Sequence, residues 1–254
     1  MEKVAAIFDE VQRIPSASNK ACIPKINKIL QNESDESENS ILLGIWRGCL
    51  DRCLLCAKKE KKVDKMIDFL SCFVSSKATS DKVFNSCIEH LLERSKATNK
   101  VIRLRACQMI QRVIVGTEDS GKEMYEDTIK SIVDTLLPRL KDKVPGVRVW
   151  ALKILSHLHQ DGDGINEEIL RLMQCDSSKD VRVAAVENVR LSKETLSALI
   201  ARVKDVRPEV RIAVYTRLSA KDIVSAKVRR YFLCVRRYFL CVLLLLMTGK
   251  RKLN

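Results

Sequence analysis

Apolar residues recur every three or four positions along most of the chain, which is the spacing of one face of an α-helix. The pattern predicts helices at Val4–Ile14, at Ile23–Leu30, as two facing helices within Ile41–Val74, at Lys82–Glu93, from Lys100 onward, at Tyr125–Leu140 and after Val147. The alternation of single apolar and polar residues that marks a half-buried strand does not occur. Only 8 glycines and 5 prolines are present, too few for the turns of an all-β fold. The sequence therefore predicts an all-α fold with short connections.

Three segments repeat one pattern, an aspartate followed by a valine five residues later and an arginine six residues later. The pairs are Asp142 with Arg148, Asp176 with Arg182, and Asp205 with Arg211, and the three arginines are 34 and 29 residues apart. Repetition at this period predicts a solenoid, in which each unit buries its apolar face against its neighbours. The pattern resembles the HEAT repeat, a pair of antiparallel helices, with somewhat short spacing. The resemblance implies a right-handed superhelix of about five to six helix pairs, with the Asp and Arg side chains forming a ladder between neighbouring repeats.

A fourth, degenerate copy of the pattern lies at Val101–Ala106. The residue six positions before its arginine, Arg103, is Ala97 rather than an aspartate. We therefore expect Arg103 to lack a ladder partner and, together with Arg105, to be available to a ligand. The arginines of the three complete copies are expected to be structural.

Two segments depart from the helical periodicity. Residues 33–39 form an acidic, polar tract without an apolar side chain, which predicts a surface loop. Near the end of the chain, the seven residues Val228–Cys234 recur identically as Val235–Cys241, and an apolar run follows. This run ends at Met247 and is shorter than the roughly 20 residues that span a bilayer. We expect a HEAT array over residues 1–230 and an atypical apolar and basic tail over residues 231–254, outside the array and not a membrane anchor.

The charge balance of the chain bears on its partners. The 254 residues carry 46 Lys and Arg against 32 Asp and Glu, a formal net charge of +14 with a sequence pI near 9.4. This excess predicts a polyanionic partner, with nucleic acid as the first candidate. The alternative is a basic surface that serves solubility alone.

The 10 cysteines do not have the spacing of a metal site. Cys49, Cys53 and Cys56 fall on one helical face without a nearby histidine, and a zinc site needs four ligands that converge. We interpret them as buried free thiols, which suits a cytosolic or nuclear compartment.

A second metal candidate lies around residues 157–172. His157 and Asp161 are one turn apart, with His159 beside them, but a third ligand is missing. The tract that starts at Asp161 resembles a calcium loop, yet Asn166 and Leu172 occupy the positions that need Gly and Glu. The sequence therefore predicts no metal and no cofactor.

Two basic clusters are candidates for contact with duplex DNA. The first lies at a predicted turn between helices and the second on a later helix, and equivalent surfaces of a solenoid lie side by side. Such clusters would contact phosphates rather than base edges, with little sequence preference. The candidate DNA-binding residues are Lys58, Lys59, Lys61, Lys62, Lys65, Lys100, Arg103, Arg105 and Arg112. The alternative is that the lysines form a solvated turn.

An ordered set of motifs points to one family. The motifs are Leu104–Ile110, Arg139–Arg148 and Ala201–Arg211 followed by Ala213–Tyr215. Together they resemble the amino-terminal HEAT array of the condensin subunit 3 family, also called the G subunit or CAP-G, over roughly Ile41 to Arg229. Chains of this family are much longer, so the resemblance suggests an N-terminal or truncated portion.

The resemblance implies a non-enzymatic subunit of the condensin complex. Such a subunit binds the kleisin subunit and double-stranded DNA in mitotic chromosome condensation, while the ATPase heads belong to other chains. It implies a nuclear and chromosomal location with a cytoplasmic pool, and no membrane contact. The sequence agrees in having no phosphate-binding loop, no zinc-protease motif and no nucleophile–base pair.

Two other functions remain open at this point. The array could be a protein-interaction scaffold for acidic peptides, like importins or phosphatase scaffolds. It could also be a lyase-like or hydrolytic HEAT enzyme acting on DNA bases, which would need an unpaired acid in a basic groove. Competition between duplex DNA and an acidic peptide would separate the first alternative from DNA binding.

Overall fold

The computed structural model of the chain describes residues 2–13, 21–26, 36–57, 60–158 and 164–219. Apart from short turns these residues are helical, and none of them forms a β-strand. After α1 (Glu2–Arg13), the first helices of successive pairs are α3 (Glu36–Leu55), α5 (Asp81–Ser95), α7 (Glu126–Leu136), α9 (Ile165–Cys175) and α11 (Lys193–Ala201). The second helices are α4 (Lys61–Ser75), α6 (Lys100–Ser120), α8 (Pro145–Leu158), α10 (Lys179–Asn188) and α12 (Pro208–Ser219). The prediction of an all-α array of helix pairs is confirmed.

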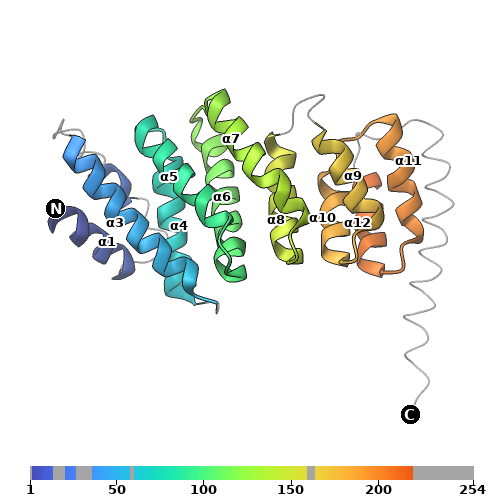
Figure 1. The fold of residues 1–254 in the computed structure, drawn as a ribbon, viewed down its shortest axis with the longest axis horizontal. Coiled ribbons are helices and arrows are strands. Elements are labelled where there is room, and N and C mark those ends of the chain that lie inside the picture. The colour runs from blue at the N-terminus through green and yellow to red at the C-terminus, as the bar shows by residue number, and fades with distance from the viewer. Residues whose placement is uncertain (1, 14–20, 27–35, 58–59, 159–163, 220–254) are drawn as a thin grey trace, which may run out of the picture.

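The helices follow one another along the long axis of the molecule, from α1 at one end to α11 and α12 at the other (Figure 1). The second helices form a layer in which α4 contacts α6, α6 contacts α8, α8 contacts α10 and α10 contacts α12. Among the first helices, α5 contacts α7 and α9 contacts α11. One continuous apolar core fills the space between the helices. Each pair therefore buries its apolar faces against its neighbours, as expected of a solenoid.

Local sequence explains where the helices start and stop. The side chain of Asn99 accepts a hydrogen bond from the amide of Val101 at 2.8 Å and caps the start of α6. The same helix ends at Gly121, whose φ of 65° lies in the left-handed region that favours glycine. Pro138 lacks an amide hydrogen, so the helix predicted over Tyr125–Leu140 ends as α7 at Leu136 and continues as the 3₁₀ helix η2 (Leu137–Lys141).

Two neighbouring second helices, α4 and α6, meet at a glycine. A Cβ atom at Gly116 of α6 would lie 2.4 Å from the hydroxyl and 2.8 Å from the Cβ of Ser75 on α4. No such contact fits between real atoms, so the missing side chain of Gly116 leaves the room that the Ser75 side chain occupies. The role of Gly116 is to set the distance between the first two helix pairs.

Two predicted segments need comment. The prediction of a loop over residues 33–39 is wrong for residues 36–39, because Glu36 and the residues after it form the first turn of α3. The tail at 231–254 lies outside the described residues, as do residues 33–35. Among the described helices, none combines the length and the apolar character needed to cross a membrane.

Candidate functional site

The repeated aspartates lie in the turns between the two helices of a pair. Asp142, Asp176 and Asp205 each precede the second helix of their pair by three residues. One carboxylate oxygen of each accepts the backbone amide two residues later, at 2.9, 2.8 and 2.9 Å respectively. This local bond holds the side chain in a fixed direction and stabilises the turn.

Each carboxylate also accepts hydrogen bonds from the guanidinium of an arginine in the preceding helix pair. Arg103 Nε lies 2.9 Å from Asp142 Oδ2, Arg148 Nε lies 2.8 Å from Asp176 Oδ2, and Arg182 Nε lies 2.9 Å from Asp205 Oδ2. The Nη2 atoms bond the other carboxylate oxygens at 3.2, 2.7 and 2.9 Å. The three predicted aspartates therefore form bidentate ion pairs that join consecutive helix pairs, and we call this series the ladder.

The register of the ladder corrects the prediction for Arg103. Each ladder arginine pairs with the aspartate side chain in the turn of the following helix pair. To the aspartate six residues before it, the arginine donates only a bond to the backbone carbonyl, as Arg148 Nη1 does to Asp142 O at 2.8 Å. Arg103 donates in the same way to Ala97 O at 2.9 Å, so Ala97 serves as well as an aspartate there. Arg103 is thus a full ladder member, with a side chain only 13% exposed. The view of Arg103 as an unpaired, ligand-facing arginine is wrong.

The carboxylates of Asp142 and Asp205 are held in their charged form. Burial alone would raise the pKa of Asp142, but hydrogen bonds from Arg103 and from the Val144 amide outweigh it and lower this pKa. For Asp205, burial is likewise outweighed by bonds from Arg182 and the Arg207 amide, so its pKa is also lowered. The ladder is therefore a set of compensated charges, and its arginines add little positive charge to the surface.

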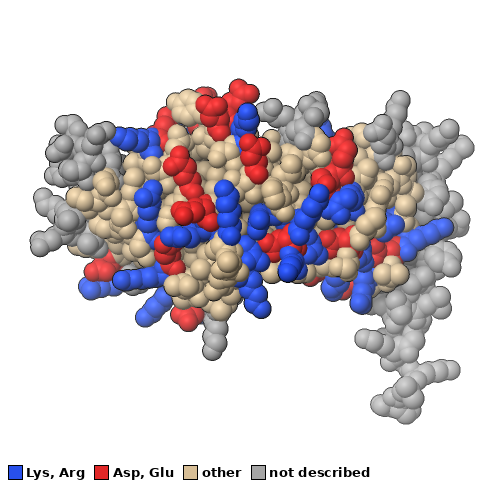
Figure 2. Space-filling model, viewed as in Figure 1, with Lys and Arg blue, Asp and Glu red and all other residues tan. Residues whose placement is uncertain are grey.

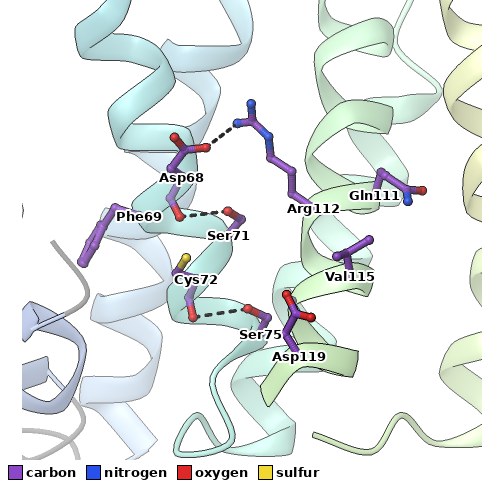
Figure 3. Close-up of a pocket in the computed structure, with 10 residues that line it drawn as sticks. Asp68, Phe69, Ser71, Cys72, Ser75, Gln111, Arg112, Val115 and Asp119 are labelled. Carbon is purple, nitrogen blue, oxygen red and sulfur yellow. Dashed lines mark hydrogen bonds and ion pairs between the residues drawn. The ribbon is translucent and has the colours of Figure 1, made fainter. Parts of the chain in front are cut away.

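The two other arginines expected to face DNA are also ion-paired. Arg105 Nη1 lies 3.6 Å from Asp64 Oδ1, and Arg112 Nη1 lies 3.0 Å from Asp68 Oδ1. Both aspartates lie on α4, so these contacts join α4 to α6, and Figure 3 shows the Asp68–Arg112 pair. Asp64 and Asp68 are one helical turn apart, a spacing visible in the sequence that could have indicated partners.

The predicted lysines are placed differently. Lys61 and Lys62 start α4 and Lys100 starts α6, and all three are exposed. Lys65 is partly buried, and Lys58 and Lys59 lie outside the described residues. The helices α4 and α6 contact each other, and these exposed lysines lie at the N-terminal ends of both.

Sequence reasoning missed further cations at this edge of the array. Exposed basic residues also lie in or beside the turns that precede the second helices: Lys96, Lys141, Lys143, Lys204 and Arg207. Lys141 pairs with Glu168 at 3.4 Å. On the face shown in Figure 2, basic and acidic side chains interleave. The signal that could have found three of these cations is their position, since Lys96, Lys141 and Lys204 each lie four residues before the start of a second helix.

A pocket of about 470 Å³ opens between α4 and α6. Its lining includes the apolar surfaces of Phe69, Cys72 and Val115, while the Asp68–Arg112 pair lies beside it (Figure 3). The Ser71 hydroxyl donates to Asp68 O at 2.9 Å and the Ser75 hydroxyl to Cys72 O at 3.4 Å, so both serines of the lining are satisfied within their own helix. The pocket has the size and lining to receive an apolar side chain.

Among the residues that the structure describes, the thiols and histidines do not assemble a metal centre. No group of three or more His, Cys, Asp or Glu side chains converges within the described residues. Burial raises the pKa of Cys53 to about 11, and burial raises that of Cys107 to about 12. These thiols stay protonated and behave as small apolar groups. His157 Nδ1 lies 3.4 Å from Glu118 Oε1, and His159 and Asp161 lie outside the described residues.

Comparison with known proteins gives a consistent result. No family model matches the chain. It is 29% identical to condensin complex subunit 3 of Xenopus laevis over 72% of this chain and 19% of the relative. Identity is 30% with the Homo sapiens protein (65% of this chain, 17% of the relative) and 31% with that of Schizosaccharomyces pombe (68% and 20%). The chain thus spans about a fifth of the length of these relatives.

The solved structures agree with the sequence relatives. The fold of this chain matches a chain in the crystal structure of the S. pombe condensin Cnd3–Cnd2 subcomplex, with a TM-score of 0.69 and 25% identity. The match covers 91% of this chain and 30% of the matching chain in that structure. The same array of helix pairs is therefore present in a relative that shares its sequence motifs. On these two lines of similarity, the chain belongs to the condensin subunit 3 family.

Proposed function

We propose that this chain is a non-catalytic HEAT-repeat subunit of a condensin complex that binds the kleisin subunit and double-stranded DNA in mitotic chromosome condensation. The observation that carries the proposal is the similarity over 91% of the chain to a structure solved as the condensin Cnd3–Cnd2 subcomplex. We further propose a nuclear and chromosomal location with a cytoplasmic pool.

The arrangement of side chains supports a binding role rather than catalysis. The carboxylates that contact the arginines of α6, those of Asp142, Asp64 and Asp68, are all ion-paired in the described structure, so none of the three is a free acid. A lyase-like or hydrolytic mechanism on DNA bases would need such an acid. An extended array of helix pairs instead offers a long surface to an extended partner.

We propose that DNA contacts use the exposed lysines more than the arginines. Lys61, Lys62 and Lys100 are exposed at the ends of two adjoining helices, and Lys58 and Lys59 come shortly before Lys61 in the sequence. Lys65, Arg105 and Arg112 would contribute at the margin of this surface, and Arg103 would act by holding the turn in place. Such lysines bind phosphates as point charges without reading bases.

The test for DNA is a salt series on unrelated duplexes with the double variant Lys61→Glu/Lys62→Glu. Affinity should fall equally for all duplexes, and the slope of log K against log salt should decrease by about 0.9 for each phosphate that the variant no longer neutralises. The matched control is Lys77→Glu/Lys130→Glu, which makes the same charge change at exposed positions before α5 and on α7. Equal loss in both variants would mean that only net charge matters, and an acidic peptide that displaces DNA would favour the scaffold alternative.

The test for kleisin is co-purification of the full chain with a condensin kleisin subunit in the absence of DNA. A stoichiometric complex is expected. If the kleisin does not bind while DNA does, the subunit role is refuted and the DNA contact stands alone.

A further inference from the structure

Side chains tie together two turns that join successive helix pairs. The turn before α5 and the connection between α6 and α7 lie at the C-terminal ends of α4 and α6, at the opposite edge of the array from the turns within each pair. Lys122 Nζ donates to Thr79 O at 2.7 Å and to Asp81 Oδ1 at 2.9 Å. The Tyr125 hydroxyl donates to Asp81 Oδ2 at 2.9 Å. Asp81, Lys122 and Tyr125 thus link the two turns, and we call these three residues the outer latch.

The outer latch holds one cation and one anion in balance. Hydrogen bonds from Lys122 and from Tyr125 lower the pKa of Asp81, so its carboxylate is charged at neutral pH. The Lys122 side chain is only 5% exposed, and its ammonium lies 5.3 Å from the centre of the Phe84 ring. Lys122 is therefore engaged by a carbonyl, a carboxylate and an aromatic ring, and it would have to give up one of these contacts to bind a second anion.

Tyr125 is the accessible member of the outer latch. It is 61% exposed, in the connection over residues 121–125, which is not helical. The other tyrosine that the structure describes, Tyr215, is partly buried on α12. An enzyme can draw an exposed, non-helical segment into its active site without unfolding a helix. The flanking acids would suit an enzyme with a basic substrate groove, and they are all exposed: Glu123, Glu126 and Asp127.

We propose that Tyr125 is a phosphorylation site, and that phosphoryl transfer from ATP by a protein tyrosine kinase opens the outer latch. The Tyr125 hydroxyl oxygen bonds to the γ-phosphorus of ATP, the bond from that phosphorus to the ADP oxygen breaks, and the hydroxyl proton is released. The product no longer donates a hydrogen bond to Asp81 and carries a charge of about −1.5 to −2 beside that carboxylate. Repulsion between the two anions then separates the turns.

The opening is confined to the two turns. The Ser120 hydroxyl donates to Ser75 O at 2.6 Å, and the Asp68–Arg112 pair also joins α4 to α6. These contacts do not involve the outer latch, so the two helices stay together when it opens. The proposal does not depend on DNA or kleisin binding.

The experiment treats the full chain with ATP and a protein tyrosine kinase that accepts acidic model substrates. Mass spectrometry should show Tyr125 phosphorylated about tenfold faster than the partly buried Tyr215, since the latter becomes accessible only when its helix opens. Amides of residues 76–81 and 121–125 should then exchange hydrogen roughly tenfold faster, while those of α8–α12 stay unchanged because contacts in a solenoid are local.

Two variants separate the steps. In Asp81→Asn the repulsion is absent, so phosphorylation of Tyr125 should change exchange by less than about twofold relative to the same variant before treatment. In Tyr125→Phe the acceptor is absent, and kinase treatment should leave exchange in both turns unchanged. Circular dichroism melting of each variant checks that the array stays folded.

Three results would overturn the proposal. The first is phosphorylation of Tyr125 that is no faster than that of Tyr215. The second is unchanged or slower exchange after phosphorylation, which would mean that Lys122 turns to the phosphate and keeps the turns together. The third is an equal increase in exchange in Asp81→Asn, which would show that repulsion from that carboxylate is not the cause.

Discussion

Replacing Asp176 by Ala tests the ladder at its centre. The carboxylate is 6% exposed and accepts three hydrogen bonds, from Arg148 Nε at 2.8 Å, Arg148 Nη2 at 2.7 Å and the Ser178 amide at 2.8 Å. The substitution leaves the charge of Arg148, 11% exposed, with only its bond to Asp142 O. Removing one partner of a buried pair costs about 3–5 kcal/mol, against about 0–1 kcal/mol for an exposed pair. We expect about 3 kcal/mol, the lower limit, because the retained bond and residual hydration partly compensate Arg148.

The assay is thermal and urea unfolding combined with hydrogen exchange. A loss of about 3 kcal/mol corresponds to a decrease in Tm of about 6–12 °C for a chain of this size. Since contacts in a solenoid are between neighbours, exchange should increase in α9–α12 while α3–α5 stay protected. The double variant Arg148→Met/Asp176→Ala should be more stable than the sum of the single changes predicts, because the orphan charge is gone.

The matched control is Asp134→Ala, the same change at an exposed position on α7. It should change the free energy of unfolding by less than about 0.5 kcal/mol. If Asp176→Ala is no more destabilising than this control, the ladder does not stabilise the array and the reasoning fails.

Three further predictions follow from the geometry. Gly116→Ala should destabilise the array by about 1–3 kcal/mol, because the new Cβ meets Ser75 on α4. Gly48→Ala, whose Cβ meets no atom within 4 Å, should stabilise the array by about 0.5–1 kcal/mol. The urea midpoints of the two variants test both expectations. Acid should unfold the array, because the pKa values of Asp142 and Asp205 are lowered in the folded state. The stability that these two carboxylates contribute is complete above their unfolded-state pKa of about 4 and is lost as the pH falls through their folded-state pKa values. A urea midpoint that stays constant from pH 7 to pH 2 would contradict this prediction. At pH 8 an alkylating reagent should label the exposed Cys175 rapidly, but Cys87 and Cys107 only when the array unfolds, since burial raises the pKa of both buried thiols to about 12. Rapid labelling of all three cysteines, measured by mass spectrometry, would show that the core is open to the reagent.

Much of the architecture was predictable because it is local. The helical periodicity follows from the 3.6-residue turn, which the chain expresses within any short window, and it placed the facing helices of Ile41–Val74 correctly as α3 and α4. The aspartate–arginine pattern is also local, since the Asx turn at Asp142 and the carbonyl bond from Arg148 both lie within seven residues. The family resemblance rests on the same ordered motifs, and the sequence relatives support it.

The contacts between helix pairs were decided by the tertiary structure alone. Whether Arg103 meets a carboxylate depends on the rotation and rise from one pair to the next, and these place Asp142 against it. The same geometry brings Asp64 and Asp68 of α4 to Arg105 and Arg112 of α6, which reduces the charge that the sequence assigned to that helix. Packing of the core sets rotation and rise, through residues such as Gly116, and no pattern within one repeat encodes them. The sequence by itself therefore determined the helix pairs and the ladder aspartates, whereas stacking decided which arginine each aspartate meets and which charges remain for a partner.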